Sequence, residues 1–135
     1  MVKYRFQTGK IMSTDKKQIK ELILNNYHNG HELSDGELYR PLLHDSWRIF
    51  WINQDGKIEW ADKETYISWY KPEKRDEKLK WKTEILSIDI EGNLAGAKIK
   101  IFNQEFGYLD FFQFMKSGDR WIMINKISER LRLKK

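Results

Sequence analysis

Asp110 is the residue of this 135-residue chain that is best suited to acid–base chemistry. It lies in the middle of the aromatic segment EFGYLDFFQFMKSGD (105–119). If its side chain points into a pocket, loss of water raises the pKa of the carboxyl group and suits it to act as a general base or acid. The alternative role is structural: an ion pair with Lys98 or Lys126 on a neighbouring strand, or a place in a subunit interface.

His44 is the second candidate catalytic residue. A histidine can transfer protons near neutral pH, and a His44–Asp110 dyad is the sharpest catalytic hypothesis that the sequence allows. Equally, His44 could donate a hydrogen bond to a backbone carbonyl and shape a turn with Asp45.

Two further histidines, His28 and His31, have a short spacing that is found in metal sites. We expect Gly30 to end a helix between them, which removes their shared face. Zinc also needs three or four well-placed ligands. The sequence therefore predicts neither a metal site nor a cofactor.

The composition excludes several classes of protein. The chain has no cysteine, which rules out disulfides, thiolate catalysis and cysteine-bound zinc. A formal charge of +5 is spread over both signs, so nucleic-acid binding is not expected. The sequence lacks phosphate-loop and hydrolase motifs, any apolar run of roughly 18 residues and the apolar core of a signal peptide. We expect a cytoplasmic protein without membrane contact.

The elements that would position these residues follow from hydrophobic spacing and from capping and turn residues. Ser13 or Thr14 can cap a first helix that ends at Gly30, and Ser34 with Glu37 forms a capping box for a second, short helix. The remaining expected elements are a hairpin at 47–60, a helix that Asp62 caps and Pro72 ends, and strands at 81–90, 94–103, 105–116 and 120–128.

Helices followed by an antiparallel meander predict an α+β fold, with a curved antiparallel sheet packed on three N-terminal helices. In the last strand, alternation places Trp121, Met123 and Ile127 on one face and Ile122 and Ile124 on the other. Apolar residues on both faces indicate that both are covered. We therefore expect a homodimer that forms through the sheet.

This order of elements resembles the nuclear transport factor 2-like superfamily, and within it the putative lumazine-binding family of small bacterial proteins. The resemblance is carried by Tyr27…Gly30…Asp35, Leu43-His44-Asp45, LSIDIEGNLAGAKIKI (86–101), Tyr108-Leu-Asp110 and GDRWIMINKIS (118–128). The chain departs from the family pattern at Asp45, where a proline is usual, and at Asp119, where a glycine is usual. Residues 1–12 carry little pattern, and we expect them to be a leader or an added edge strand before a single domain at 13–135. The resemblance implies that this domain is a cone, a curved sheet wrapped round helices, with an internal cavity.

Aromatic and amide side chains could line that cavity. Trp60 and Trp69, near the expected mouth of the cone, could stack on a flat ligand. Asn125 is a polar residue in an apolar strand and needs a partner, which could be Asp110 or a ligand. The complete set of pocket candidates is Tyr27, Trp60, Trp69, Tyr108 and Asn125.

Three functions stay open at this point. The leading one is binding of an apolar or aromatic small molecule in the cone, without catalysis. The second is a cofactor-independent isomerase or dehydratase, chemistry that the resemblance includes, with Asp110 as the acid or base and His44 or a tyrosine hydroxyl as its helper. The third is a protein-interaction module with a filled cone and an exposed apolar surface, because fold alone does not fix function.

Overall fold

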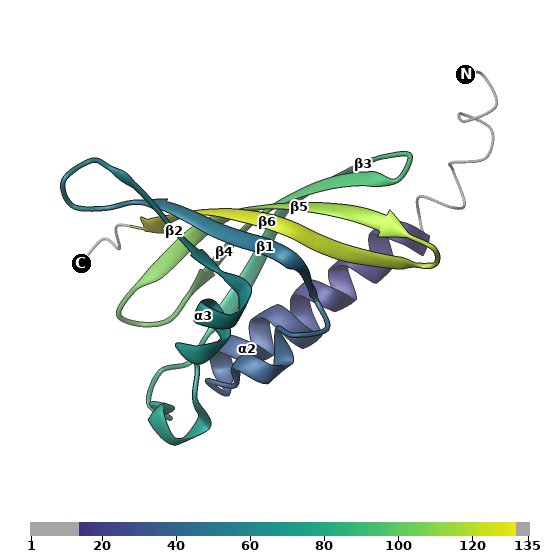
Figure 1. Cartoon of the computed structure of the whole chain (residues 1–135). Helices are drawn as coiled ribbons and strands as arrows, with labels where there is room; N and C mark the ends of the chain where they lie inside the picture. Colours follow the sequence, from purple (N-terminus) through teal and green to yellow (C-terminus); the bar gives the residue numbers. More distant parts are fainter. Residues whose placement is uncertain (1–13, 132–135) are drawn as a thin grey trace.

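The computed structural model describes residues 14–131, so the expected leader at 1–12 lies outside the described residues. The described residues form one six-stranded sheet with the strand order β2-β1-β6-β5-β4-β3. Neighbouring strands are antiparallel except for the parallel pair of β1 and β6. The strands are β1 (Leu43–Ile52), β2 (Ile58–Asp62), β3 (Lys82–Glu91), β4 (Leu94–Phe102), β5 (Gly107–Ser117) and β6 (Arg120–Leu131). Figure 1 shows a curved sheet with the helices on one side of it, which confirms the predicted α+β fold.

The N-terminal helix is longer than predicted. Residues 14–21 are α-helical, and the helix continues through a π-helical stretch, η1 (Leu22–Tyr27), into α2 (His28–Glu32). The prediction that Gly30 ends the helix is therefore wrong. A Cβ at Gly30 would lie 2.2 Å from a ring carbon of Tyr39. Because Gly30 has no side chain, the Tyr39 ring can pack directly against the helix at this position.

The predicted second helix is only a single turn. It is the 3₁₀ turn η2 (Gly36–Leu38), and its cap is Asp35, whose carboxylate accepts the backbone N–H of Glu37 at 3.0 Å. Ser34 does not open this turn because its φ of 49° is left-handed, a conformation typical of a helix end.

The hairpin and the third helix agree with the sequence prediction. β1 and β2 pair around the turn at 53–57, and α3 (Lys63–Ser68) follows directly. The Asp62 carboxylate caps α3 by accepting the backbone N–H of Thr65 at 2.9 Å. The helix ends at Ser68, before Pro72, which instead begins the 3₁₀ turn η3 (Pro72–Lys74).

A β-bulge in β6 changes which side chains face the helices. Phe114 pairs with Met123, whereas the preceding Gln113 pairs with Asn125, so Ile124 is an extra residue. The predicted alternation is therefore wrong after Met123. Ile127 lies on the outer face of the sheet, and its neighbours Lys126 and Ser128 lie on the inner face, toward the helices.

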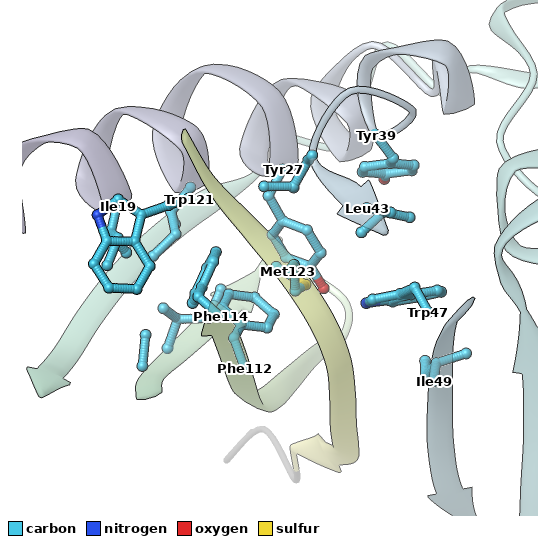
Figure 2. Close-up of a cluster of buried hydrophobic side chains, with 14 of the residues drawn as sticks. Ile19, Tyr27, Tyr39, Leu43, Trp47, Ile49, Phe112, Phe114, Trp121 and Met123 are labelled. Atoms are coloured by element: carbon cyan, nitrogen blue, oxygen red, sulfur yellow. The ribbon is translucent and has the colours of Figure 1, made fainter. Parts of the chain in front are cut away.

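The core lies between the inner face of the sheet and the helices, and Figure 2 shows part of it. Its largest fully buried side chains include Trp47, Tyr27, Tyr39, Tyr66, Phe112 and Phe114. At the start of the N-terminal helix, buried Asp15 accepts hydrogen bonds from Trp121 Nε1 (3.1 Å) and Lys116 Nζ (2.9 Å). Within residues 14–131 no helix has the length and apolar character needed to cross a membrane.

Candidate functional site

The carboxylate of Asp110 lies in the core and is fully buried. One of its oxygens, Oδ1, accepts the Ser128 hydroxyl at 2.6 Å, and Oδ2 accepts the hydroxyl of Tyr27. Lys126 Nζ is 3.9 Å from Oδ2, at ion-pair distance. Asp110 is thus enclosed by two hydroxyl donors and one cation, as a buried carboxylate requires.

Lys126 links Asp110 to a second tyrosine. Its ammonium group donates to the hydroxyl oxygens of Tyr27 at 2.6 Å and Tyr66 at 2.9 Å. Nζ also lies 4.8 Å and 4.5 Å from the centroids of these two rings, within cation–π range. We call Tyr27, Tyr66, Asp110, Lys126 and Ser128 the Asp110 network.

Burial and charge determine the protonation states in the network. Burial lowers the pKa of Lys126 to about 8, and the negative charge of Asp110 opposes this lowering. Burial, followed by the Asp110 charge, holds the pKa of Tyr27 well above its usual value. At neutral pH, Lys126 is therefore mostly cationic and Tyr27 remains a proton donor.

The fold brings the network together from four elements. Asp110 and Ser128 are directly opposite each other on β5 and β6, and Lys126 is opposite Phe112. Tyr27 is the last residue of the π-helical stretch, a helix irregularity that is frequent at functional sites. Tyr66 reaches the network from α3, whose position is set by the Asp62 cap.

His31 extends this polar interior toward the end of α2. Its Nδ1 is hydrogen-bonded to the Tyr39 hydroxyl at 2.8 Å and to the backbone carbonyl oxygen of Tyr27 at 3.1 Å. The other nitrogen, Nε2, is 3.4 Å from the Tyr70 hydroxyl. Burial, followed by the charge of Lys126, keeps the pKa of His31 well below its usual value, so the ring is neutral at pH 7.

Residues 69–81, which we call the cover segment, close the interior near the end of α2. The backbone carbonyl of Tyr70 accepts Gly36 N–H at 2.9 Å, and Trp81 N–H donates to the Glu32 carboxylate at 2.9 Å. The Trp81 ring lies 5.1 Å from the His31 ring. On its surface side, the cover segment contributes to an open hollow of about 730 Å³, which is lined by Leu33, Asp35, Pro72, Arg75, Asp76, Glu77 and Lys78. None of these lining residues belongs to the Asp110 network.

The structure does not bring the two predicted catalytic residues together. Asp110 is enclosed in the core, whereas His44 is exposed at the start of β1, where its Nδ1 is hydrogen-bonded to the Ser46 hydroxyl at 2.8 Å. Of the two lysines considered as ion-pair partners, Lys126 takes that position, while Lys98 lies over the Phe111 ring on the outer face. A catalytic role for either predicted residue stays a prediction.

The predicted pocket residues divide between the interior and the surface. Tyr27 lies in the Asp110 network, and Tyr108 is partly buried on the same face of β5. Trp60 is exposed beneath the Arg48 guanidinium, and exposed Trp69 packs edge-on against Trp51.

Asn125 and the two histidines His28 and His31 do not form a common site. Asn125 lies opposite Gln113 on the outer face, away from Asp110. His28 Nδ1 is hydrogen-bonded to the Thr83 hydroxyl at 2.8 Å, whereas His31 points into the core. Among residues 14–131, no three potential metal ligands come together.

Sequence reasoning missed Tyr66, Ser128 and His31 as members of the polar interior, and it considered Lys126 only as an ion-pair partner. The bulge at Ile124 explains the strand residues, because it turns Lys126 and Ser128 inward. The signal in the sequence that could have revealed the inward position of Lys126 was its charge inside a largely apolar strand.

The outer face of the same strands is apolar and exposed. A row of side chains crosses neighbouring strands in register, from Trp60 and Phe50 to Ile127 and Phe111. Ile127 is 59% exposed and Phe111 43% exposed. Next to this row, the Asn125 side-chain oxygen is buried and makes no hydrogen bond to any residue in the described part of the chain.

Solved structures of NTF2-like and cystatin-like proteins share this α+β fold with its curved sheet. An NTF2-like protein of unknown function from Shewanella baltica is 24% identical, with a TM-score of 0.77, covering 90% of this chain and 97% of that one. An NTF2-like protein of unknown function from Methylobacillus flagellatus is 26% identical, with a TM-score of 0.74, covering 88% and 94%. A cystatin-like domain of unknown function from Nostoc punctiforme is 9% identical, with a TM-score of 0.59, covering 82% and 76%.

Residues 14–128 match the putative lumazine-binding family, and the chain belongs to this family. No curated protein matches the chain.

Proposed function

We propose that the protein binds a small, flat, aromatic or apolar molecule in its interior, beside the Asp110 network. The observation that carries this proposal is the burial of an ion pair, Asp110 with Lys126, among aromatic rings. The surrounding rings are those of Tyr27, Tyr39, Tyr66 and Phe112. An apolar environment with a few converging polar groups is the usual composition of a small-molecule site.

A purely structural role explains the buried pair less well. Desolvation of two charges costs several kcal/mol, and well-packed apolar residues of similar volume are often equally or more stabilising. Buried groups with strongly shifted pKa values cluster at functional sites, and Lys126 is such a group. The name of the family, putative lumazine-binding, agrees with a flat bicyclic ligand and supplies a first compound to test.

Binding requires side chains to move, because those of the described residues occupy the interior around Asp110. The cover segment is the element best suited to open. It is held by hydrogen bonds from Gly36 to Tyr70 and from Trp81 to Glu32, and by the Arg75 side chain, which donates to the Glu32 backbone carbonyl at 3.0 Å. Its own turn, η3, has no buried residue.

Thermal unfolding with and without lumazine tests the proposal. A ligand at a hundred times its dissociation constant stabilises the folded state by about 2.7 kcal/mol, which is a measurable rise in Tm. We expect this rise in the wild type and in Gln113→Ala, a variant of the outer face. Tyr27→Phe, which removes the hydroxyl between Asp110 and Lys126, should reduce the rise. Absence of stabilisation by lumazine and by a panel of flat aromatic compounds would refute the proposal.

We further propose that two copies associate through the outer face of the sheet. Phe111 and Ile127 supply exposed apolar area, and Asn125 has a buried oxygen that no described residue satisfies. A second copy can supply apolar cover for this face and a hydrogen-bond donor for the Asn125 oxygen. Gln113 lies directly beside Asn125 on the same face, so the side-chain amide of Gln113 from the second copy is a suitable donor. Both features support a two-fold association in which the same face of each chain contacts the other.

Sedimentation velocity over a concentration series tests this association. We expect a dimer in the wild type and a monomer for Ile127→Glu, which places a charge in the apolar row. Leu24→Glu, at an exposed apolar position on the N-terminal helix, is the matched control and should remain dimeric. A monomeric wild type, or a dimeric Ile127→Glu variant, would contradict the proposal.

A further inference from the structure

Trp47 contains an unused hydrogen-bond donor in the core. The side chain is fully buried in β1, and its indole N–H makes no hydrogen bond to any of residues 14–131. An indole nitrogen can only donate, and buried tryptophans normally find an acceptor. This N–H therefore calls for an acceptor atom that the described residues do not supply.

The unused donor lies against the Asp110 network. The Trp47 ring packs on the Tyr66 ring with 4.9 Å between centroids, and Lys126 Nζ is 4.5 Å from the centroid of that same Tyr66 ring. β1 and β6 are paired beside this point, with Ile49 opposite Lys126. Figure 2 shows the indole nitrogen on the side of the Trp47 ring that faces Tyr27.

Lys126 adds donor capacity at the same place. An ammonium group has three N–H bonds, and Tyr27 and Tyr66 accept two of them. The distance of 3.9 Å from Nζ to Asp110 is longer than a hydrogen bond. The interior thus holds two N–H groups, one on Trp47 and one on Lys126, without a hydrogen-bond acceptor among the described residues, and both side chains lie against the Tyr66 ring.

We infer that the ligand of this interior carries a hydrogen-bond acceptor, a carbonyl oxygen or a ring nitrogen, which the Trp47 indole N–H binds beside the Lys126 ammonium. This inference rests on the proposed function and narrows it from flat aromatic molecules in general to heteroaromatic or carbonyl-bearing ones. An aromatic hydrocarbon of the same outline would gain the ring contacts and leave both donors unpaired. Trp47 is thus a specificity-determining residue.

A pair of probes with similar outlines tests the inference: coumarin, which has a ring carbonyl, and naphthalene, which has no hydrogen-bonding atom. Saturation-transfer NMR titrations give the affinity of each compound for the wild-type protein. We expect coumarin to bind about tenfold or more tightly than naphthalene, the ratio that one hydrogen bond to a donor pair of this kind supplies. Trp47→Phe should remove most of this preference and leave naphthalene binding unchanged.

Trp121→Phe is the matched control. Trp121 is also a buried tryptophan of the core, but its indole N–H already donates to Asp15. We expect this variant to keep the preference for coumarin. If Trp47→Phe fails to fold, the test uses the indole ¹H–¹⁵N resonance of Trp47 in the wild type instead. We expect coumarin to shift this resonance, and we expect naphthalene not to shift it in the same direction.

The outcomes separate the inference from the function on which it rests. Equal affinity of the wild type for the two probes, or an unchanged coumarin preference in Trp47→Phe, would overturn the inference and leave ligand binding intact. Failure of the wild type to bind either probe would overturn the inference, and the proposed function would fall with it only if lumazine and the panel of flat aromatic compounds also failed to bind. An indole resonance that already has the shift of a hydrogen-bonded N–H without ligand would assign the acceptor to a buried water and also overturn the inference.

Discussion

The two faces of β5 and β6 differ in a way that reverses the usual distribution of residues. On the inner face, Asp110 is 0% exposed and Lys126 is 2% exposed, whereas the adjacent Phe111 and Ile127 on the outer face are 43% and 59% exposed. The inner charges have hydrogen-bond partners, whereas the outer apolar side chains are about half exposed. The comparison teaches that one pair of strands carries a buried polar network on its inner face and exposed apolar side chains on its outer face. The proposed ligand site rests on the first, and the proposed association of two copies rests on the second.

The largest expected difference between the faces is in packing energy. Phe112 is 1% exposed, and Phe112→Ala should lower the free energy of unfolding by about 3–5 kcal/mol through loss of contacts and formation of a cavity. Phe111→Ala, one residue away, should cost less than about 1 kcal/mol to the isolated chain. Urea unfolding at low protein concentration measures both, and equal losses would contradict the assignment of faces.

The buried ion pair should show strong coupling. Asp110→Asn leaves the Lys126 ammonium without its counter-charge and should cost about 3 kcal/mol or more in free energy of unfolding. Lys126→Met in the same chain should recover part of this loss, since no unpaired buried charge remains. A double-mutant cycle measures the coupling, and additive losses would show that the two residues do not act as a pair.

The two buried tryptophans, Trp121 and Trp47, should differ less in their contribution to the free energy of unfolding. Trp121→Phe removes a hydrogen bond to the Asp15 carboxylate, whereas Trp47→Phe removes an N–H that has no described acceptor. Trp121→Phe should therefore cost about 1.5–3 kcal/mol more than Trp47→Phe in free energy of unfolding. Chemical denaturation of the two variants decides this, and a larger loss for Trp47→Phe would mean that its N–H has an acceptor in the free protein.

Per pH unit, the smallest effect is the pH dependence of stability that Lys126 contributes. Its pKa is about 8 in the folded chain and about 10.4 when unfolded, so between these values the unfolded state binds more protons. The free energy of unfolding should therefore rise with pH in this window, by up to about 1.4 kcal/mol per pH unit. Near and above pH 10 the raised pKa values of Tyr27 and Tyr66 act in the opposite direction, because the unfolded tyrosines lose protons first.

Lys126→Met is the control for this pH dependence and should lack the rise between pH 8 and about 10. Urea midpoints of the two proteins at a series of pH values provide the comparison. A wild type whose stability only falls over this range, in parallel with the variant, would mean that Lys126 titrates as it does in the unfolded chain.

Much of the fold follows from local signals in the sequence. Asp62 caps its helix as predicted, and β3, β4 and β5 lie within two residues of their predicted bounds because alternation and turn residues mark them. Gly30 could not be interpreted correctly from the sequence, since its role depends on the approach of the Tyr39 ring.

The site was only partly predictable for the same reason. A charge within an aromatic strand made Asp110 visible, but strict alternation put Ile127 on the same face as Trp121 and Met123, which is the inner face. The bulge at Ile124 arises from pairing with β5, and no local pattern in β6 reveals it. Tyr66 and His31 join the interior through tertiary packing, which local periodicity does not specify.

Two methionines make the most direct test of ligand binding on the inner face. Met123 is fully buried on the inner face and Met115 is exposed on the outer face. With ¹³C-labelled methionine methyl groups, titration with lumazine should shift the Met123 resonance in a saturable manner and leave that of Met115 unchanged. A saturable shift of Met115 with Met123 unmoved, or no shift of either, would contradict the account.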